Sequence, residues 1–267
     1  MNRRDWMILA AWAIAPGGRS WSQPPTPDPP EFKVLVGSFG IKPEPISTEE
    51  IVARQGRVYQ FRSGTTEVVV IDPARKRVEL VDLVGRVQTE VSFDRLDEAV
   101  AKVAAKLRAE IARREKTGAR SDAVEAAMTR DLVEPKFRRL AGAKVARIRL
   151  SNATIEVDAL GEPEPDPSRL SLLAITLESI ARLGAFLTPD DLPPFAELNA
   201  LAALKAERLR PAEISYLYRL AGPPQKFRRT YRLVPELTVR EREAIVRVDR
   251  VRESATMLRP ERYRAPR

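Results

Sequence analysis

The chain has 267 residues, a formal net charge of +9, and neither cysteine nor histidine. These absences exclude disulfides, Ser-His-Asp and Cys-His catalytic sites, ordinary zinc sites and iron–sulfur or c-type haem ligation. Carboxylate acid–base chemistry and oxygen-ligated Ca²⁺ or Mg²⁺ remain open. However, the sequence contains no Ser-x-x-Lys pair, phosphate loop or calcium loop, so we expect no catalytic, cofactor-binding or metal-binding residue.

The start of the chain has the build of a secretory signal peptide over residues 1–22. Arg3 and Arg4 precede the apolar run Trp6–Ala15, which has about half of the roughly 20 residues that a membrane-spanning helix needs. We therefore expect cleavage and export to the periplasm or the extracellular space, with no transmembrane anchor afterwards. The arginine pair also resembles a twin-arginine signal, so the Sec and twin-arginine routes both remain open.

A proline-rich spacer follows over residues 23–31. Its segment 23–30 reads QPPTPDPP, and each proline fixes φ and removes an N–H donor. We expect an extended segment that separates the folded body from the cleavage site. The folded body is expected to begin near Phe32.

Residues 56–93 predict an antiparallel meander of strands, because apolar side chains alternate between turn residues. One face of this sheet must be buried. Asp94 is the expected N-cap of the helix that follows, which should end by Gly118. The apolar stripe of this helix, from Leu96 to Ile111, would cover the sheet. A second helix is expected over about residues 121–134, because Pro135 stops it.

A hairpin is expected over residues 144–158, and an acidic, proline-rich connector follows it. Asp166 is the expected N-cap of a helix that ends at Gly184. A further helix is expected over about residues 194–204.

The last part of the chain predicts a basic hairpin and a C-terminal helix. Alternating apolar residues predict strands over 214–220 and 227–233. Thr238 and Glu241 form a capping box before an Arg/Glu-rich helix. We expect the tail from Arg259 to fray.

Strands and helices occur in blocks rather than in regular βαβ alternation, which favours an α+β fold. We expect an antiparallel β-meander and hairpins packed against amphipathic helices. The expected organisation is a signal peptide (1–22), a spacer (23–31), a segment with the meander, helices and one hairpin (32–160), and a segment with helices, the basic hairpin and the C-terminal helix (161–267). The last two segments are either separate subdomains or one domain.

The C-terminal quarter of the chain carries the surplus of positive charge. Residues 205–267 contain 17 basic and 8 acidic residues, so their net charge of +9 equals that of the whole chain. In the expected hairpin, aromatic side chains share one face and most of the basic side chains lie on the other. Arginine presents a planar fork that suits phosphate and carboxylate groups. The candidate residues for an anionic partner are Arg219, Lys226, Arg228, Arg229 and Arg232. An ordinary solvated face is the alternative.

Two groups of carboxylates are candidates for acid–base catalysis or Ca²⁺ binding. Glu162, Glu164 and Asp166 lie in the proline-rich connector, and Asp190 and Asp191 precede a helix. Helix capping and solvation are the alternatives for both groups.

The spacing of apolar residues in 58–61, 67–73 and 78–80 is similar to that in the curved sheets of periplasmic lipoprotein carriers. This resemblance covers only the meander and implies a hydrophobic cleft between sheet and helices, with no functional residue carried over. As a whole, the chain resembles uncharacterised exported proteins of GC-rich bacteria, and that resemblance implies no activity.

We expect a non-enzymatic binding or structural module of the cell envelope that uses its basic C-terminal region. Its partner would be an envelope protein, an anionic polymer or a lipid headgroup. Nucleic acid is not expected, because the exported chain lacks a recognition motif. Two alternatives remain open: a periplasmic carrier of a lipid or other apolar ligand, and a carboxylate-dependent hydrolase.

Overall fold

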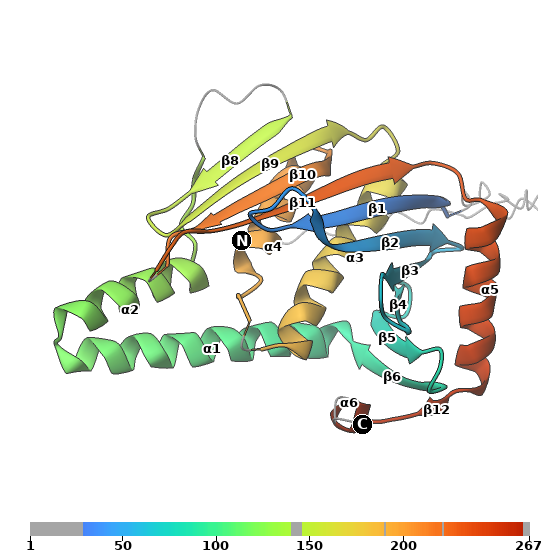
Figure 1. The fold of residues 1–267 in the computed structure, drawn as a ribbon, viewed down its shortest axis with the longest axis horizontal. Helices are drawn as coiled ribbons and strands as arrows, with labels where there is room; N and C mark the ends of the chain where they lie inside the picture. The colour runs from blue at the N-terminus through green and yellow to red at the C-terminus, as the bar shows by residue number, and fades with distance from the viewer. Residues whose placement is uncertain (1–28, 140–145, 190, 221, 264–267) are drawn as a thin grey trace, which may run out of the picture.

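The computed structural model describes residues 29–139, 146–189, 191–220 and 222–263. The expected signal peptide and most of the proline-rich spacer therefore lie outside the described residues. The described part forms one twelve-stranded sheet with six helices (Figure 1), and it confirms the expected α+β class.

The sheet contains strands from both ends of the chain. Its strands are β1 (Phe32–Phe39), β2 (Pro45–Arg54), β3 (Arg57–Arg62), β4 (Glu67–Asp72), β5 (Arg77–Asp82), β6 (Val87–Ser92), β7 (Arg138–Arg139), β8 (Arg147–Ser151), β9 (Ile155–Pro163), β10 (Leu209–Tyr218), β11 (Gln225–Val234) and β12 (Thr256–Met257). Their order is β12-β6-β5-β4-β3-β2-β1-β11-β10-β9-β8-β7. All neighbours are antiparallel except β12 and β6.

The helices are α1 (Phe93–Thr117), α2 (Arg120–Val133), α3 (Pro167–Leu187), α4 (Phe195–Ala206), α5 (Val239–Ser254) and α6 (Pro260–Tyr263). The expected meander is confirmed as β3 to β6, and the expected hairpins are β8–β9 and β10–β11. Four strands stand where no strand was predicted: β1, β2 and the two-residue strands β7 and β12.

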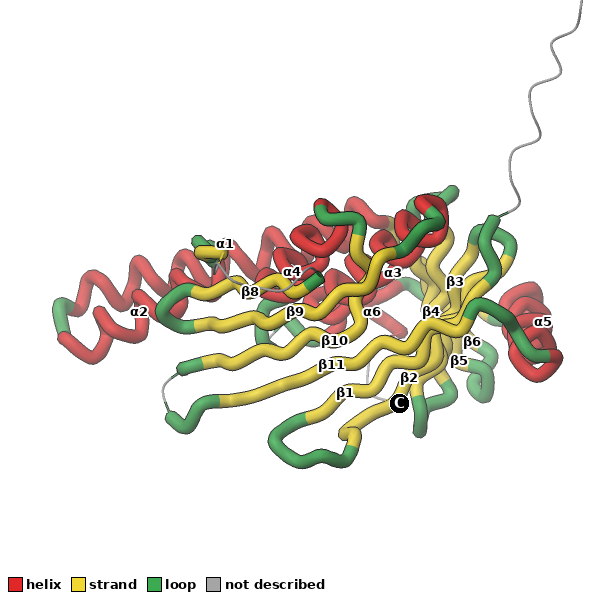
Figure 2. The backbone as a smooth tube through the Cα atoms, turned by 90° about the horizontal axis from the view of Figure 1, so that it is seen from above, coloured by secondary structure: helices red, strands yellow, loops and turns green. Residues whose placement is uncertain are grey.

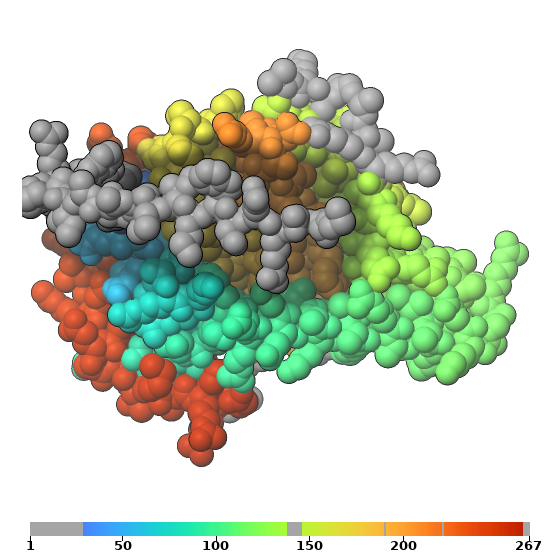
Figure 3. All heavy atoms as spheres, turned by 180° about the vertical axis from the view of Figure 1, so that it is seen from behind, coloured from blue at the N-terminus to red at the C-terminus, as the bar shows by residue number. Residues whose placement is uncertain are grey.

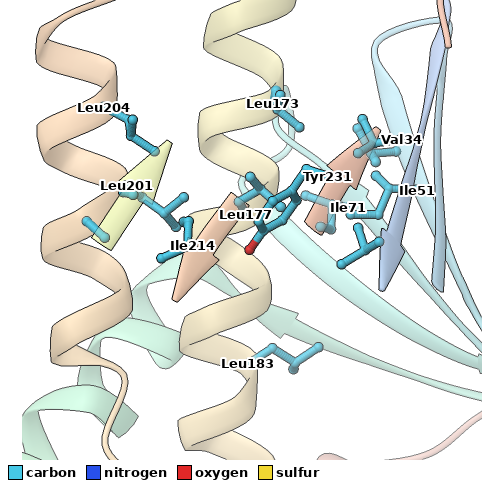
Figure 4. Packing of buried hydrophobic residues seen from close by; sticks show 14 of the residues in the cluster. Val34, Ile51, Ile71, Leu173, Leu177, Leu183, Leu201, Leu204, Ile214 and Tyr231 are labelled. Carbon is cyan, nitrogen blue, oxygen red and sulfur yellow. The ribbon is translucent and has the colours of Figure 1, made fainter. Parts of the chain in front are cut away.

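The main hydrophobic core lies on one face of the sheet, which we call the inner face. Leucines of α3 and α4 meet inward side chains of the strands there (Figure 4). The labelled residues of this core are Val34, Ile51, Ile71, Leu173, Leu177, Leu183, Leu201, Leu204, Ile214 and Tyr231. By length and composition α3 is apolar enough to cross a membrane, although its leucines are used here to fill the core.

The first helix does not cover the sheet as expected. It packs along α2 and α3, and the pair α1–α2 extends beyond the rest of the molecule as a rod (Figure 3). The space expected for a ligand cleft between the meander and this helix is filled by α3, whose Leu173 and Leu177 are buried in the core.

Three boundaries differ from the sequence-based expectation. Ser92, and not Asp94, caps α1, because its side chain accepts a hydrogen bond from the amide of Arg95. Gly184 does not end α3, which continues to Leu187. The expected frayed tail includes α6, where the Tyr263 hydroxyl donates to Glu67 at 2.6 Å.

A smaller hydrophobic cluster lies on the opposite, outer face of the sheet. Leu237, Ile245 and Val248 from α5 and the residues before it pack against outward residues of β2 to β5. Figure 2 shows α5 beside β3 to β6, apart from the other long helices. Among the described residues, α5 covers only this part of the outer face, and exposed side chains such as Leu160, Lys226 and Arg232 lie on the rest of it.

Candidate functional site

The outer face carries a groove of about 760 Å³ beside the first turns of α5. We call it the α5 groove. Strands β1, β2, β3 and β11 form its floor and α5 forms one wall. Its lining residues are Leu35, Val36, Gly37, Thr48, Glu49, Glu50, Val52, Phe61, Arg62, Ser63, Thr230, Arg232, Arg240, Glu241 and Ala244.

Two rows of paired residues across the strands make the floor. In the first row, Leu35 pairs with Arg232 on one side and with Glu50 on the other, and Glu50 pairs with Phe61. Residues that are directly opposite in a sheet point to the same face. The row therefore places two apolar side chains beside one cation and one carboxylate on the outer face.

The second row makes the floor deeper at a glycine. Gly37 pairs with Thr230 and Thr48. A Cβ atom at Gly37 would lie 2.9 Å from Cε2 of Phe39 and 3.1 Å from Oγ1 of Thr230. The absence of a side chain at Gly37 therefore lets the Phe39 ring and the Thr230 side chain approach the backbone of β1 closely.

The wall of the groove begins at a reinforced helix terminus. Thr238 and Glu241 form the capping box that the sequence predicts. Glu241 also accepts a hydrogen bond from Lys33 on the outer face of β1. Burial would raise the pKa of Glu241, but the hydrogen bonds from Lys33 and Thr238 outweigh it and lower the pKa to about 2. The carboxylate is therefore charged at neutral pH and ties α5 to the sheet.

The far half of α5 is tied to the sheet by a second polar cluster. The Tyr59 hydroxyl donates to Asp249 at 3.2 Å, and burial together with the Asp249 carboxylate raises the pKa of Tyr59 to about 12. Arg252 donates to Asp249 at 2.7 Å and to Glu79 at 2.6 and 2.9 Å. Glu79 is only 3% exposed, so this ion pair is buried between helix and sheet. The wall of the groove is thus fixed at both ends.

Three of the six charged residues that line the groove form ion pairs within the described part of the protein. Arg62 pairs with Glu49 at 3.4 Å, and Glu241 pairs with Lys33. The structure gives no ion pair for Arg232 or Arg240 within its described residues. The groove therefore combines apolar side chains and the exposed Glu50 carboxylate on its floor with guanidinium groups at its rim.

The predicted basic residues divide between the two faces of the hairpin β10–β11. Arg228 and Arg232 lie on the outer face with Lys226, because they alternate with Tyr231 and Phe227 along β11. The Arg228 guanidinium lies over the Phe39 ring, 4.4 Å from its centroid. Arg232 lines the α5 groove.

Arg219 belongs to the same outer face but is engaged with the sheet. It donates to Glu156 at 2.8 Å from the end of β10. Its guanidinium is therefore occupied by a carboxylate of the neighbouring strand.

Arg229 lies on the inner face, away from the other candidates. It pairs with Glu197 of α4, and the Glu197 carboxylate raises its pKa. Burial raises the pKa values of the neighbouring Tyr218 and Tyr231. Arg229 therefore does not share the outer face with the other four candidates, because adjacent residues on a strand point to opposite faces.

The candidate carboxylates are distributed among structural roles. Glu162 pairs with Arg210, and the buried Glu164 pairs with Arg169 at 3.4 Å. Asp166 accepts hydrogen bonds from the first amides of α3, as predicted for an N-cap.

The remaining pair of acids gives no site either. Asp190 lies outside the described residues, and Asp191 is exposed. Among the described residues, no group of acidic side chains is arranged to hold a metal ion.

The groove was missed by the sequence analysis because β1 and β2 were not recognised as strands. The signal was present in the alternation of Phe32, Val34 and Val36 with Leu35 and Gly37. The pairing of β1 with the distant β11 carries no local signal. No protein-family model matches the chain, and no curated protein matches it in sequence.

Proposed function

We propose that this protein is a non-enzymatic binding protein of the cell envelope that holds an anionic amphiphile in the α5 groove. The ligand would have an acyl or similar apolar chain and a carboxylate or phosphate group. This proposal joins two sequence-based hypotheses, the basic binding module and the carrier of an apolar ligand.

The observation that carries the proposal is the composition of the groove. Leu35, Val52 and Phe61 form the apolar part of the floor, beside the Glu50 carboxylate. A volume of about 760 Å³ falls within the range of about 300–1,000 Å³ of small-molecule sites. Arg232 and Arg240 stand at its rim. A guanidinium group binds carboxylate and phosphate through two parallel hydrogen bonds.

Lipids in the envelope supply such ligands, and the expected export of the chain would bring the groove to them. The hydrolase hypothesis receives less support, because Glu162 and Glu164 pair with arginines and Asp166 caps a helix. The polymer-binding hypothesis receives less support from Arg219 and Arg229, because each already pairs with a carboxylate.

A fluorescence titration with a dansylated fatty acid tests the proposal. We expect saturable binding to the full exported chain. Gly37→Leu would displace the Phe39 and Thr230 side chains at the floor and should weaken binding about tenfold or more, which corresponds to about 1.4 kcal/mol. Arg232→Gln should weaken binding of the acid but leave binding of its methyl ester nearly unchanged.

Leu160→Ser is the matched control, because Leu160 is a 45%-exposed apolar residue on the outer face of β9, outside the groove. Unchanged binding in both Gly37→Leu and Arg232→Gln would overturn the proposal. Equal loss in Leu160→Ser would indicate general surface adsorption and would overturn it too. Circular dichroism of each variant checks that the fold is retained.

A further inference from the structure

The loop between β1 and β2, together with the first residues of β2, presents two of the most exposed large apolar side chains in the described part of the protein. Ile41 is 85% exposed and Ile46 is 71% exposed. Single exposed apolar residues are common on protein surfaces. Here two isoleucines stand at one tip, which we call the isoleucine tip.

The backbone directs these side chains outward. Ser38 pairs with Ser47 and Phe39 pairs with Pro45, so Ile46 is the extra residue of a β-bulge. A bulge leaves its extra residue without a ladder partner and redirects its side chain. A Cβ atom at Gly40 would lie 3.0 Å from Cδ1 of Ile46, so the absence of a side chain there lets Ile46 lie across the loop.

Cationic side chains surround the isoleucine tip. Lys42 is exposed in the loop itself. Arg228, which pairs with Phe39 and lies over its ring, stands at the base, and Lys226 is exposed further along β11. Glu44 is the exposed acid of the loop, so the cations exceed the acids at this end of the sheet.

We infer that the isoleucine tip docks onto a lipid surface that bears anionic headgroups. Ile41 and Ile46 enter the boundary between headgroups and acyl chains, while Lys42, Arg228 and Lys226 contact phosphate groups. Apolar side chains flanked by cations are the composition that binds such interfaces.

A protein partner fits this surface less well. Specific protein interfaces bury about 1,200–2,000 Å² in total, and a loop tip with two isoleucines offers too little area for that. A membrane needs only shallow insertion of a few side chains, because the lipid surface adapts to the loop.

The inference is separate from the proposed ligand of the α5 groove. Gly37 lines the groove and Phe39 ends β1, so the isoleucine tip lies just beyond the groove along the same strand, and the two surfaces meet at the Phe39 ring. Membrane docking would bring the groove close to lipid, but docking does not require that the groove be occupied.

Co-flotation with vesicles tests the inference. We expect the full exported chain to float with vesicles of phosphatidylcholine and phosphatidylglycerol, and to bind pure phosphatidylcholine vesicles more weakly. The double variant Ile41→Ser/Ile46→Ser should lose about tenfold or more in vesicle affinity, because each isoleucine contributes apolar burial. Lys42→Glu should lose affinity only for the anionic vesicles.

Val239→Ser is the matched control, because Val239 is 71% exposed and lies at the start of α5 rather than in the loop. Absence of wild-type binding, or equal binding by wild type and the double isoleucine variant, would overturn the inference. A loss of the same size in Val239→Ser would also overturn it. Phe61→Ser removes an apolar side chain from the groove floor on β3 and should float normally, so failure of the groove proposal and failure of membrane docking are distinguishable.

Discussion

The two faces of the sheet are built from the same strands but are covered in different ways. On the inner face, α3 and α4 bury a continuous core that reaches from Val34 and Ile71 to Ile214. On the outer face, α5 covers a small cluster around Val52 and Tyr59 and leaves the α5 groove at its edge. The inner face therefore holds the fold together, and the outer face is where a ligand or surface has access.

The kinds of contact also differ between the faces. The inner face relies mainly on leucine, valine and isoleucine side chains, and it also contains the ion pair of Arg229 with Glu197. The outer face attaches α5 largely through ion pairs and hydrogen bonds, among them Lys33 with Glu241 and Arg252 with Glu79. A helix held in this way should respond to charge and pH, whereas the inner core should respond to side-chain volume.

The largest expected effect comes from the same substitution, leucine to alanine, at one position on each face of the sheet. Leu177→Ala on the inner face should lower the free energy of unfolding by about 2–5 kcal/mol, because Leu177 is only 4% exposed and its loss leaves a cavity. Leu160→Ala on the outer face should change it by less than about 0.5 kcal/mol. Chemical denaturation measures both values, and similar losses would contradict the division between the faces.

The second effect concerns the attachment of α5. Glu79→Ala leaves the buried Arg252 with Asp249 as its remaining partner. We therefore expect the free energy of unfolding to fall by about 2 kcal/mol, which is less than the roughly 3–5 kcal/mol for breaking an isolated buried pair. Hydrogen exchange should accelerate in α5 while α3 stays protected.

Glu243→Ala is the control for this measurement, because Glu243 is an exposed acid on the same helix. It should leave exchange in α5 nearly unchanged. Acceleration in α3 as large as in α5 would show that the helix and the inner core unfold together.

A smaller effect compares two glycines, one in close contact with neighbouring side chains and one with open space beside it. A Cβ atom at Gly161 would lie 2.7 Å from Cβ of Leu209 and 2.8 Å from Cδ2 of Leu204, so Gly161→Ala should destabilise the protein by about 1–3 kcal/mol. Gly184 in α3 has open space, so Gly184→Ala should stabilise it by about 0.5–1 kcal/mol. Thermal unfolding gives both signs, and a destabilising Gly184→Ala would refute the second.

The smallest expected effect is the pH dependence of the tie between Glu241 and Lys33. The folded-state pKa of Glu241 is about 2, below its ordinary value of 4.5, so the charged carboxylate stabilises the fold. This contribution is fully present above about pH 4.5 and is lost as the pH falls towards 2. The stability difference between wild type and Glu241→Gln should therefore shrink over this range, and a constant difference would contradict the assignment.

Local signals predicted many of the elements of the fold correctly. The alternation in the meander, the N-cap at Asp166 and the capping box at Thr238 and Glu241 each depend on residues close in sequence. The predicted helix end at Gly184 was wrong because Leu183 and Ala185, on either side of this glycine, are buried. Their tertiary packing outweighs the low helix propensity of glycine.

The site was harder to predict because it depends on contacts between distant segments. The α5 groove needs Leu35 of β1, Arg232 of β11 and Ala244 of α5 on one surface. The alternation within β11 was sufficient to place Arg228 and Arg232 together. It was not sufficient to show that Arg229 meets Glu197, because α4 approaches from elsewhere in the chain.

The position of β1 has a consequence for how the chain folds. The first strand lies in the middle of the sheet, where Lys33 pairs with Val234 near the C-terminal end. Pairing of such distant segments slows folding, since a long loop must close before the contact forms. A chain that ends before Gln225 would leave one edge of β1 unpaired, and unpaired edges promote aggregation. The sheet therefore becomes continuous only after nearly the whole chain has been made.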